Sequence, residues 1–181
     1  MITKKMAAAL NMHLNREHYS AYLYLSMASH ASSIGLKGMA NWFQVQIQEE
    51  QVHAQKFHNY ILTQGERIVL EAIPKPPGGF ESPLALFEET LKHEREVTAE
   101  VNHLAALADK ENDYATAVML QWFVTEQVEE ETTANDIIQK LKLIGNDGSG
   151  GGSPTRRTVT VRSSAEPSGT LSSTSHRSSG S

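Results

Sequence analysis

Apolar residues recur at steps of three and four along four long segments of this chain, which is the spacing of an amphipathic α-helix. No proline occurs before Pro74, so nothing interrupts the first two segments. Ser82 and Pro83 form a typical helix start, and Gly145 is a candidate for the residue that ends the last helix. The sequence therefore predicts an all-α fold. The expected helices cover about residues 3–32, 36–64, 82–109 and 113–144.

The connections between these helices predict how they are arranged. The first and last connections are only a few residues long, so each joins an antiparallel hairpin. The middle connection, residues 65–81, reaches roughly 56 Å at about 3.3 Å per residue, whereas each helix is about 40 Å long at about 1.5 Å per residue. A loop of this length can return the chain to the far end of the bundle and make the second and third helices parallel. We therefore expect a four-helix bundle with one long crossover.

The C-terminal part of the chain has a different composition. From Ser149 to Ser181, 23 of 33 residues are Ser, Gly, Thr or Pro, too few apolar residues to form a core. We interpret residues 1–148 as the helical domain and residues 149–181 as a flexible, disordered tail. An engineered fusion and a divergent natural tail both explain it. The tail has four arginines and one glutamate, so the net charge of −5 divides into +3 for the tail and −8 for the domain.

Composition also excludes several classes of function. An acidic domain argues against a general nucleic-acid binder, which needs a basic surface. The absence of cysteine excludes disulfide scaffolds and sulfur-ligated iron or zinc sites. No apolar run approaches the roughly 20 residues of a membrane span, and no targeting segment is recognisable. We expect a cytoplasmic protein that does not bind membranes.

Each predicted helix interrupts its apolar stripe with glutamate near its middle. A misplaced stripe explains one such residue, but a buried carboxylate is costly, and four at one level favour bound cations between them. Glu50 and His53 are also three residues apart, close enough on a helix to bind one metal, although the same pair on a surface means little. Oxygen ligands with few nitrogens suit Fe, Mn or Mg. The four glutamates, which together balance two divalent cations, are Glu17, Glu50, Glu94 and Glu130.

Four sequence stretches resemble the bacterial non-haem ferritins, and the likeness extends from the first residues to about Gly148. The stretches are residues 14–24, 48–53, 92–94 and 122–131. The resemblance implies a ferritin-like bundle with a di-iron ferroxidase centre. One iron would be held by Glu17, Glu50 and His53, and the second by Glu50, Glu94 and Glu130.

The resemblance also implies roles for neighbouring residues. Gln127 would lie beside the iron pair, at a position where a symmetric di-iron site has a stronger ligand. Tyr24 would supply an electron, and Trp122 is a weaker candidate for that role. A third iron site would use Glu49, Glu126 and Glu129, together with Glu130. Haem is not expected, because Gln51 stands where the haem-binding relatives have methionine.

The implied activity is oxidation of Fe²⁺ by O₂ or H₂O₂, with storage of ferric mineral inside a homo-oligomeric cage of 24 subunits. The apolar loop segment 68–73 is expected at a subunit interface. Residues 146–150 resemble the turn before the family's fifth helix, which the tail replaces. Two alternatives stay open. The chain could be a ferritin shell that serves as a scaffold displaying the tail, or a smaller di-iron oxygenase.

Overall fold

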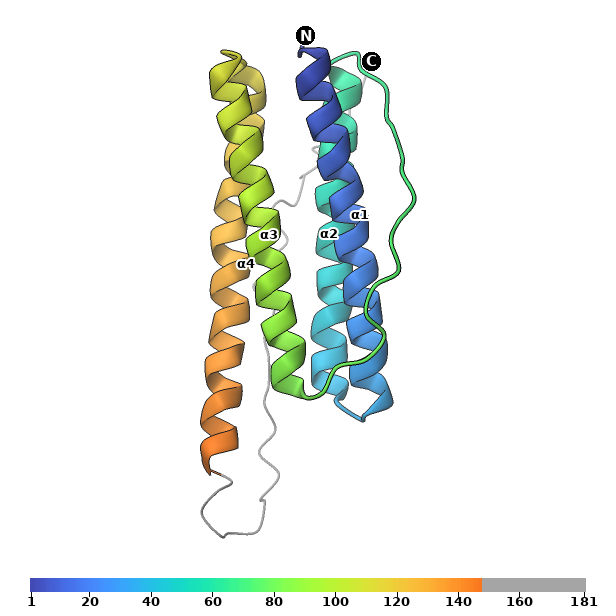
Figure 1. Cartoon of the computed structure of the whole chain (residues 1–181), viewed down its shortest axis with the longest axis vertical. Coiled ribbons are helices and arrows are strands. Elements are labelled where there is room, and N and C mark those ends of the chain that lie inside the picture. Colours follow the sequence, from blue (N-terminus) through green and yellow to red (C-terminus); the bar gives the residue numbers. More distant parts are fainter. Residues whose placement is uncertain (148–181) are drawn as a thin grey trace, which may run out of the picture.

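The computed structural model describes residues 1–147, and these form four long helices (Figure 1). The helices pair as two antiparallel hairpins, α1 with α2 and α3 with α4, and the predicted four-helix bundle is confirmed. The part of the chain that the structure describes has no strand. The predicted tail, residues 149–181, lies outside the described residues. The bounds of the helices are α1 Lys4–Ser33, α2 Lys37–Thr63, α3 Pro83–Lys110 and α4 Tyr114–Asp147.

The helix ends largely follow the capping residues in the sequence. Ser82 Oγ accepts a hydrogen bond from the backbone N–H of Ala85 at 3.0 Å, with proline at the start of the helix, as predicted. Gly35 takes a positive φ of 81° in the turn between α1 and α2, a conformation that glycine adopts without steric cost. The predicted helix end at Gly145 was wrong, because α4 continues through this residue to Asp147. Gly145 does not take the left-handed backbone conformation that a terminating glycine needs.

The long crossover runs along the outside of α1 and returns the chain to the opposite end of the bundle (Figure 1). Two asparagines, one helical turn apart on α1, hold its first part in an extended conformation. Asn11 accepts from the backbone N–H of Val69 at 2.7 Å, and Asn15 donates to the Val69 carbonyl at 2.8 Å. Asn15 also accepts from the N–H of Glu71 at 2.8 Å. These side-chain amides satisfy loop backbone groups that have no partner strand.

The apolar segment 68–73 has a mixed environment. Ile68 packs against the core, whereas Val69, Leu70 and Ile73 stay exposed. Their role as a subunit interface therefore stays a prediction for three of the apolar side chains. Within residues 1–147, no helix is long and apolar enough to cross a membrane.

The interior consists of two apolar clusters with a polar layer between them. One cluster contains Leu14, Phe57 and Phe123, and the other contains Tyr24 and Phe87. Along each helix, the layer lies at the level that the glutamates occupy in the sequence pattern. Buried polar side chains in this layer are Glu17, Glu50, His53, Glu94 and Gln127. The fold therefore places a charged layer inside a bundle whose two ends are apolar.

Candidate metal centre

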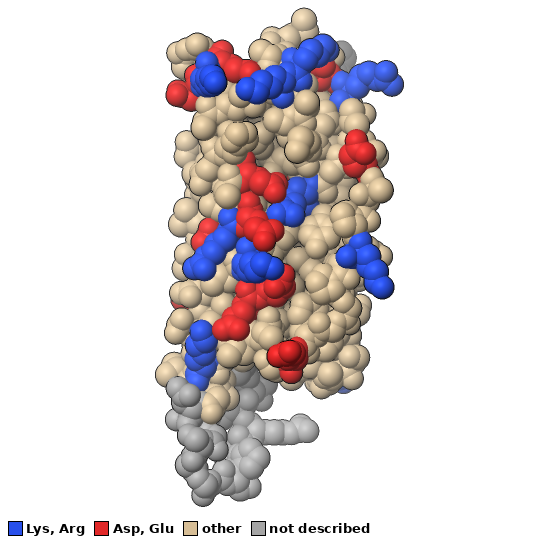
Figure 2. Space-filling model, viewed as in Figure 1, with Lys and Arg blue, Asp and Glu red and all other residues tan. Residues whose placement is uncertain are grey.

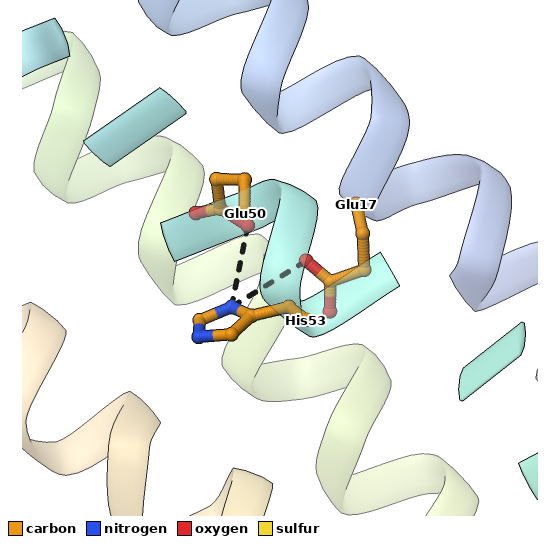
Figure 3. Close-up of side chains that lie close together, drawn as sticks. All are labelled: Glu17, Glu50 and His53. Atoms are coloured by element: carbon orange, nitrogen blue, oxygen red, sulfur yellow. Dashed lines mark ion pairs between the residues drawn. The ribbon is translucent and has the colours of Figure 1, made fainter. Parts of the chain in front are cut away.

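Three potential metal ligands converge from α1 and α2 (Figure 3). Glu17, Glu50 and His53 each offer one ligand atom, and these atoms all lie within 4.8 Å of one another. The Nδ1 atom of His53 lies 3.4 Å from Oε2 of Glu50 and 3.9 Å from Oε2 of Glu17. All three residues are buried. The i, i+3 spacing brings Glu50 and His53 together on α2, and the α1–α2 hairpin brings in Glu17.

Glu17 carries a negative charge although it is buried. Burial alone would raise its pKa, but His13, Glu50 and His53 together outweigh burial and hold the pKa at about 2. The Nε2 atom of His13 lies 2.9 Å from Oε1 of Glu17. Oε2 of Glu17 has no hydrogen-bond partner among the described residues. A buried, ionised carboxylate oxygen without a hydrogen-bond partner attracts a cation.

The α3 ligand, Glu94, is held by neutral hydrogen-bond donors. The Tyr24 hydroxyl donates to Oε1 of Glu94, and the side-chain amide of Gln127 donates to Oε2 at 3.1 Å. Burial raises the pKa of Glu94 to about 7, although both hydrogen bonds oppose this increase. Both carboxylate oxygens of Glu94 therefore accept hydrogen bonds, and a metal would have to compete with Tyr24 and Gln127 for them.

Carboxylates from all four helices lie close enough to raise one another's pKa. Burial and the charges of Glu17 and Glu94 raise the pKa of Glu50 well above its usual value. Burial and the charges of Glu94 and Glu49 do the same for Glu130. A divalent cation between these groups would replace repulsion by attraction and displace their protons.

The inward face of α4 differs from the predicted one. The sequence pattern put Glu126 and Glu130 on the apolar stripe, but both are only partly buried, and Gln127 is the buried side chain at this level. The buried stripe of α4 passes instead through Phe123, Gln127 and Ala134. A long helix drifts relative to a regular spacing of three and four residues, so one residue of misplacement is easily introduced.

The residues predicted for a third iron site are brought together less closely. Glu49 is partly buried, and burial and the charge of Glu126 raise its pKa. Burial and the charge of Glu129 likewise raise the pKa of Glu126. Glu129 itself is exposed. The charges of all three glutamates act on Glu130, and a metal among them stays a prediction.

The two candidate redox aromatics occupy different environments. Tyr24 is fully buried, contacts Glu94 and stacks near Phe43 with ring centroids 5.9 Å apart. Trp122 is 36% exposed; its ring meets His53 edge-on at 5.4 Å, and the Lys56 ammonium lies 3.9 Å from its centroid. Tyr24 therefore donates a hydrogen bond to the candidate ligand Glu94, whereas Trp122 packs against the candidate ligand His53.

Sequence reasoning missed the role of His13. Single histidines on helices are more often surface or core residues than functional ones, but the structure buries His13 against Glu17. The signal was present, because His13 precedes Glu17 by four residues and so lies on the same face of α1. His93, left unassigned for the same reason, is also buried, and its Nε2 lies 2.8 Å from the Ser20 hydroxyl.

The bundle, its single crossover and its internal carboxylate–histidine group define a class of protein, and comparison with known proteins agrees. A family model described as a ferritin-like domain matches residues 7–144. The chain belongs to this family.

Its curated relatives include bacterial non-heme ferritins. The protein of Staphylococcus epidermidis is 40% identical over 147 residues, which cover 81% of this chain and 89% of that protein. The Staphylococcus aureus protein is 38% identical with the same coverage. The sequence-based resemblance to bacterial non-haem ferritins is thus confirmed.

Solved structures show the same fold. An open pore ferritin from the hyperthermophilic archaeon Archaeoglobus fulgidus is 51% identical, with a TM-score of 0.80 and coverage of 82% of this chain and 91% of that one. A humanized archaeal ferritin is 53% identical, also with a TM-score of 0.80, and the match covers 82% of this chain and 90% of that one.

Proposed function

We propose that this chain is an iron-storage ferroxidase, which oxidises Fe²⁺ with O₂ or H₂O₂ inside the bundle and keeps the ferric product within a homo-oligomeric cage. The domain responsible is residues 1–148. The observation that supports this most directly is the buried group of Glu17, Glu50 and His53, whose ligand atoms lie within 4.8 Å of one another. Oxygen ligands with one imidazole suit iron, and membership of the ferritin-like family favours iron as the substrate.

The first Fe²⁺ is expected between Glu17, Glu50 and His53, where little rearrangement is needed. Glu17 is ionised, and burial lowers the pKa of His53, so its imidazole is neutral and has a free lone pair. The second Fe²⁺ is expected between Glu50, Glu94 and Glu130, with Glu50 shared. This site forms only when Glu94 exchanges its hydrogen bonds from Tyr24 and Gln127 for a metal.

The chemistry assigned to this pair is a two-electron reduction of O₂. Each Fe²⁺ gives one electron, O₂ leaves as H₂O₂, and hydrolysis of the ferric ions releases protons as ferric oxyhydroxide forms. The apolar clusters above and below the site keep bulk water away from it. When a third Fe²⁺ is also bound, it and buried Tyr24 would supply the third and fourth electrons that reduce O₂ to water instead of H₂O₂. Haem has no part in this proposal, and Glu49, Glu126 and Glu129 are the proposed ligands of a third iron with Glu130.

Assembly into a cage of 24 subunits is part of the same proposal. Figure 2 shows that charged side chains gather in bands on the face in view, with large areas between them that carry no charge. Exposed apolar side chains include Leu70 in the crossover and Val118 and Val128 on α4. Burial of such surfaces between subunits is the usual reason that a helical bundle leaves them exposed. Nothing in residues 1–147 favours the alternative of a shell that only displays the tail.

A direct test combines size-exclusion chromatography with aerobic addition of Fe²⁺ to the metal-free protein. We expect a large assembly that develops ferric absorbance quickly and keeps the iron soluble. The variant Glu50→Ala, which lacks the proposed shared ligand, should assemble equally but lose rapid oxidation by at least about 100-fold. A small species that oxidises iron without retaining it would instead favour the oxygenase, and an assembly with no oxidation above that of the variant would contradict the proposal.

A further inference from the structure

His13 forms a bridge between α1 and α3 that ends at the proposed metal site. It is 2% exposed, and both of its ring nitrogens face carboxylates. Nε2 lies 2.9 Å from Oε1 of Glu17, and Nδ1 lies 3.4 Å from Oε2 of Glu100. The ring also packs edge-on against Phe57, with centroids 4.7 Å apart. Neither ring nitrogen has a partner with hydrogen-bond geometry among the described residues. The imidazole is therefore confined by two close contacts with carboxylates and by an aromatic ring beside it.

The outer end of this bridge is itself anchored. Glu100 is partly exposed, and its other oxygen, Oε1, lies 3.2 Å from Nε of Arg16. Arg16 in turn lies 2.8 Å from Glu96, its second carboxylate partner. Arg16 and Glu100 therefore hold Nδ1 of His13 from the surface side, and His13 reaches inward to Glu17. Among the ion pairs of the described residues, Glu96 pairs with Arg16 but not with His13.

The two carboxylate oxygens of Glu17 face different histidines. Oε1 faces His13, whereas Oε2 faces His53 at 3.9 Å and has no hydrogen-bond partner in the described part of the chain. A carboxylate whose one oxygen is held by a neighbouring side chain presents the other in a defined direction, which is what an outer partner does for a metal ligand.

We propose that His13, braced by Glu100, is a positioning residue that holds Glu17 so that Oε2 is presented to the first metal ion. This inference rests on the proposed function, because it assumes that Glu17 is a ligand. It adds a residue from outside the ligand set, and it assigns a task to a surface carboxylate on α3 that does not contact the metal.

The test uses Co²⁺ as a metal that does not oxidise in air, titrated anaerobically into the assembled, metal-free protein and followed by its visible absorption. His13→Leu, which keeps the volume but removes both nitrogens, should weaken binding of the first Co²⁺ by roughly 10- to 100-fold. His13→Gln retains a donor toward Glu17 and should recover a large part of this loss. With Fe²⁺, His13→Leu should raise KM more than it lowers kcat, because substrate binding is what it disturbs.

Glu100 and Glu96 supply a matched pair of controls on α3. Their side chains are 44% and 49% exposed, and both pair with Arg16, but only Glu100 contacts His13. Glu100→Gln should weaken the first Co²⁺ several-fold, whereas Glu96→Gln should leave it within about twofold. Because both changes are on the surface, loss of folding does not confuse this comparison.

Two results separate this inference from the proposed function. If Glu17→Ala loses the first Co²⁺ while His13→Leu and Glu100→Gln bind it like the unchanged protein, the positioning role is wrong and the metal site stands. If Glu17→Ala also binds Co²⁺ normally, the proposed site is wrong as well. Thermal unfolding of the metal-free variants identifies any that fold poorly. Should His13→Leu be one of these, equal binding by Glu100→Gln and Glu96→Gln would overturn the inference.

Discussion

The two helix hairpins contribute unlike halves to the same site. On α1 and α2, Glu17 is ionised and His53 is neutral, so both are ready to bind a cation. On α3 and α4, burial and neighbouring charges raise the pKa of Glu94 to about 7 and that of Glu130 well above its usual value. The α1–α2 half thus combines an ionised Glu17 with Glu50, whose pKa is raised, whereas the pKa values of both carboxylates in the α3–α4 half are raised.

The difference comes from the partners that each half provides. A cationic histidine, His13, faces Glu17 and stabilises its charge in the interior. Glu94 receives only neutral donors, Tyr24 and Gln127, which do not outweigh the cost of burying its charge. The comparison teaches that similar glutamates at one level of a bundle can have different tasks. We expect the two halves to bind metal in sequence, first at α1 and α2 and then at α3 and α4.

The largest expected effect comes from removing one ligand in each half. Glu17→Gln should lose both strongly bound Co²⁺ ions, because the second ion depends on the first to neutralise the site. Glu94→Gln should keep one Co²⁺ per chain at close to its original affinity. Isothermal titration of the two variants with Co²⁺ measures the number of ions bound. Loss of both ions from Glu94→Gln would show that the α1–α2 half does not bind the first ion by itself, and would contradict the expected order of binding.

A smaller effect is expected from pH. The first ion must displace a proton from Glu50, whereas the second must displace protons from Glu94 and Glu130, whose pKa values are raised. Below the pKa of about 7 of Glu94, affinity for the second ion should fall by roughly tenfold per pH unit or more. Titration between about pH 6 and 8, in buffers that differ in heat of ionisation, counts the protons released. Equal pH dependence for the two ions would contradict the comparison.

The smallest effect should come from making the α3–α4 half resemble the other half. Gln127→His replaces a neutral amide beside Glu94 by a potential metal ligand. The second metal should bind a few-fold more tightly, and ferric ion should leave more slowly. The first burst of Fe²⁺ oxidation should then be intact, and later turnovers should slow by a few-fold. Stopped-flow absorbance over repeated additions measures both phases, and unchanged later turnovers would remove Gln127 from any role in iron release.

Much of this architecture could be read from local spacing. Four helices, two hairpins and a crossover were predicted from periodicity, capping residues and loop length, and the structure confirms them. The pairing of Glu50 with His53 also followed from spacing, because residues three and four apart share a helix face. That Glu17 lies beside this pair was implied by the family resemblance, and the structure brings the three together. The roles of these residues, and of the second and third metal sites, stay predictions that the proposed experiments address.

The errors were of a different kind. Gly145 looked like a helix end, but glycine inside a helix costs only about 1 kcal/mol relative to alanine, and α4 continues past it. Glu126 looked buried, but the rotation of α4 brings Gln127 inward. Where α4 ends and which of its side chains faces inward both depend on how the helix packs against its neighbours. This packing overrides local preference.

The sequence by itself determined which residues can share a face, because helical geometry is local and repeats along the chain. It determined the level at which each glutamate lies and the need for a long crossover. Only the tertiary structure decided which partner each carboxylate meets. The contacts from His13 to Glu100 and from Tyr24 to Glu94 join α1 to α3 across 70 residues or more, and they depend on the rotation of each helix about its own axis. Those contacts decide which carboxylates are ionised and which keep a proton.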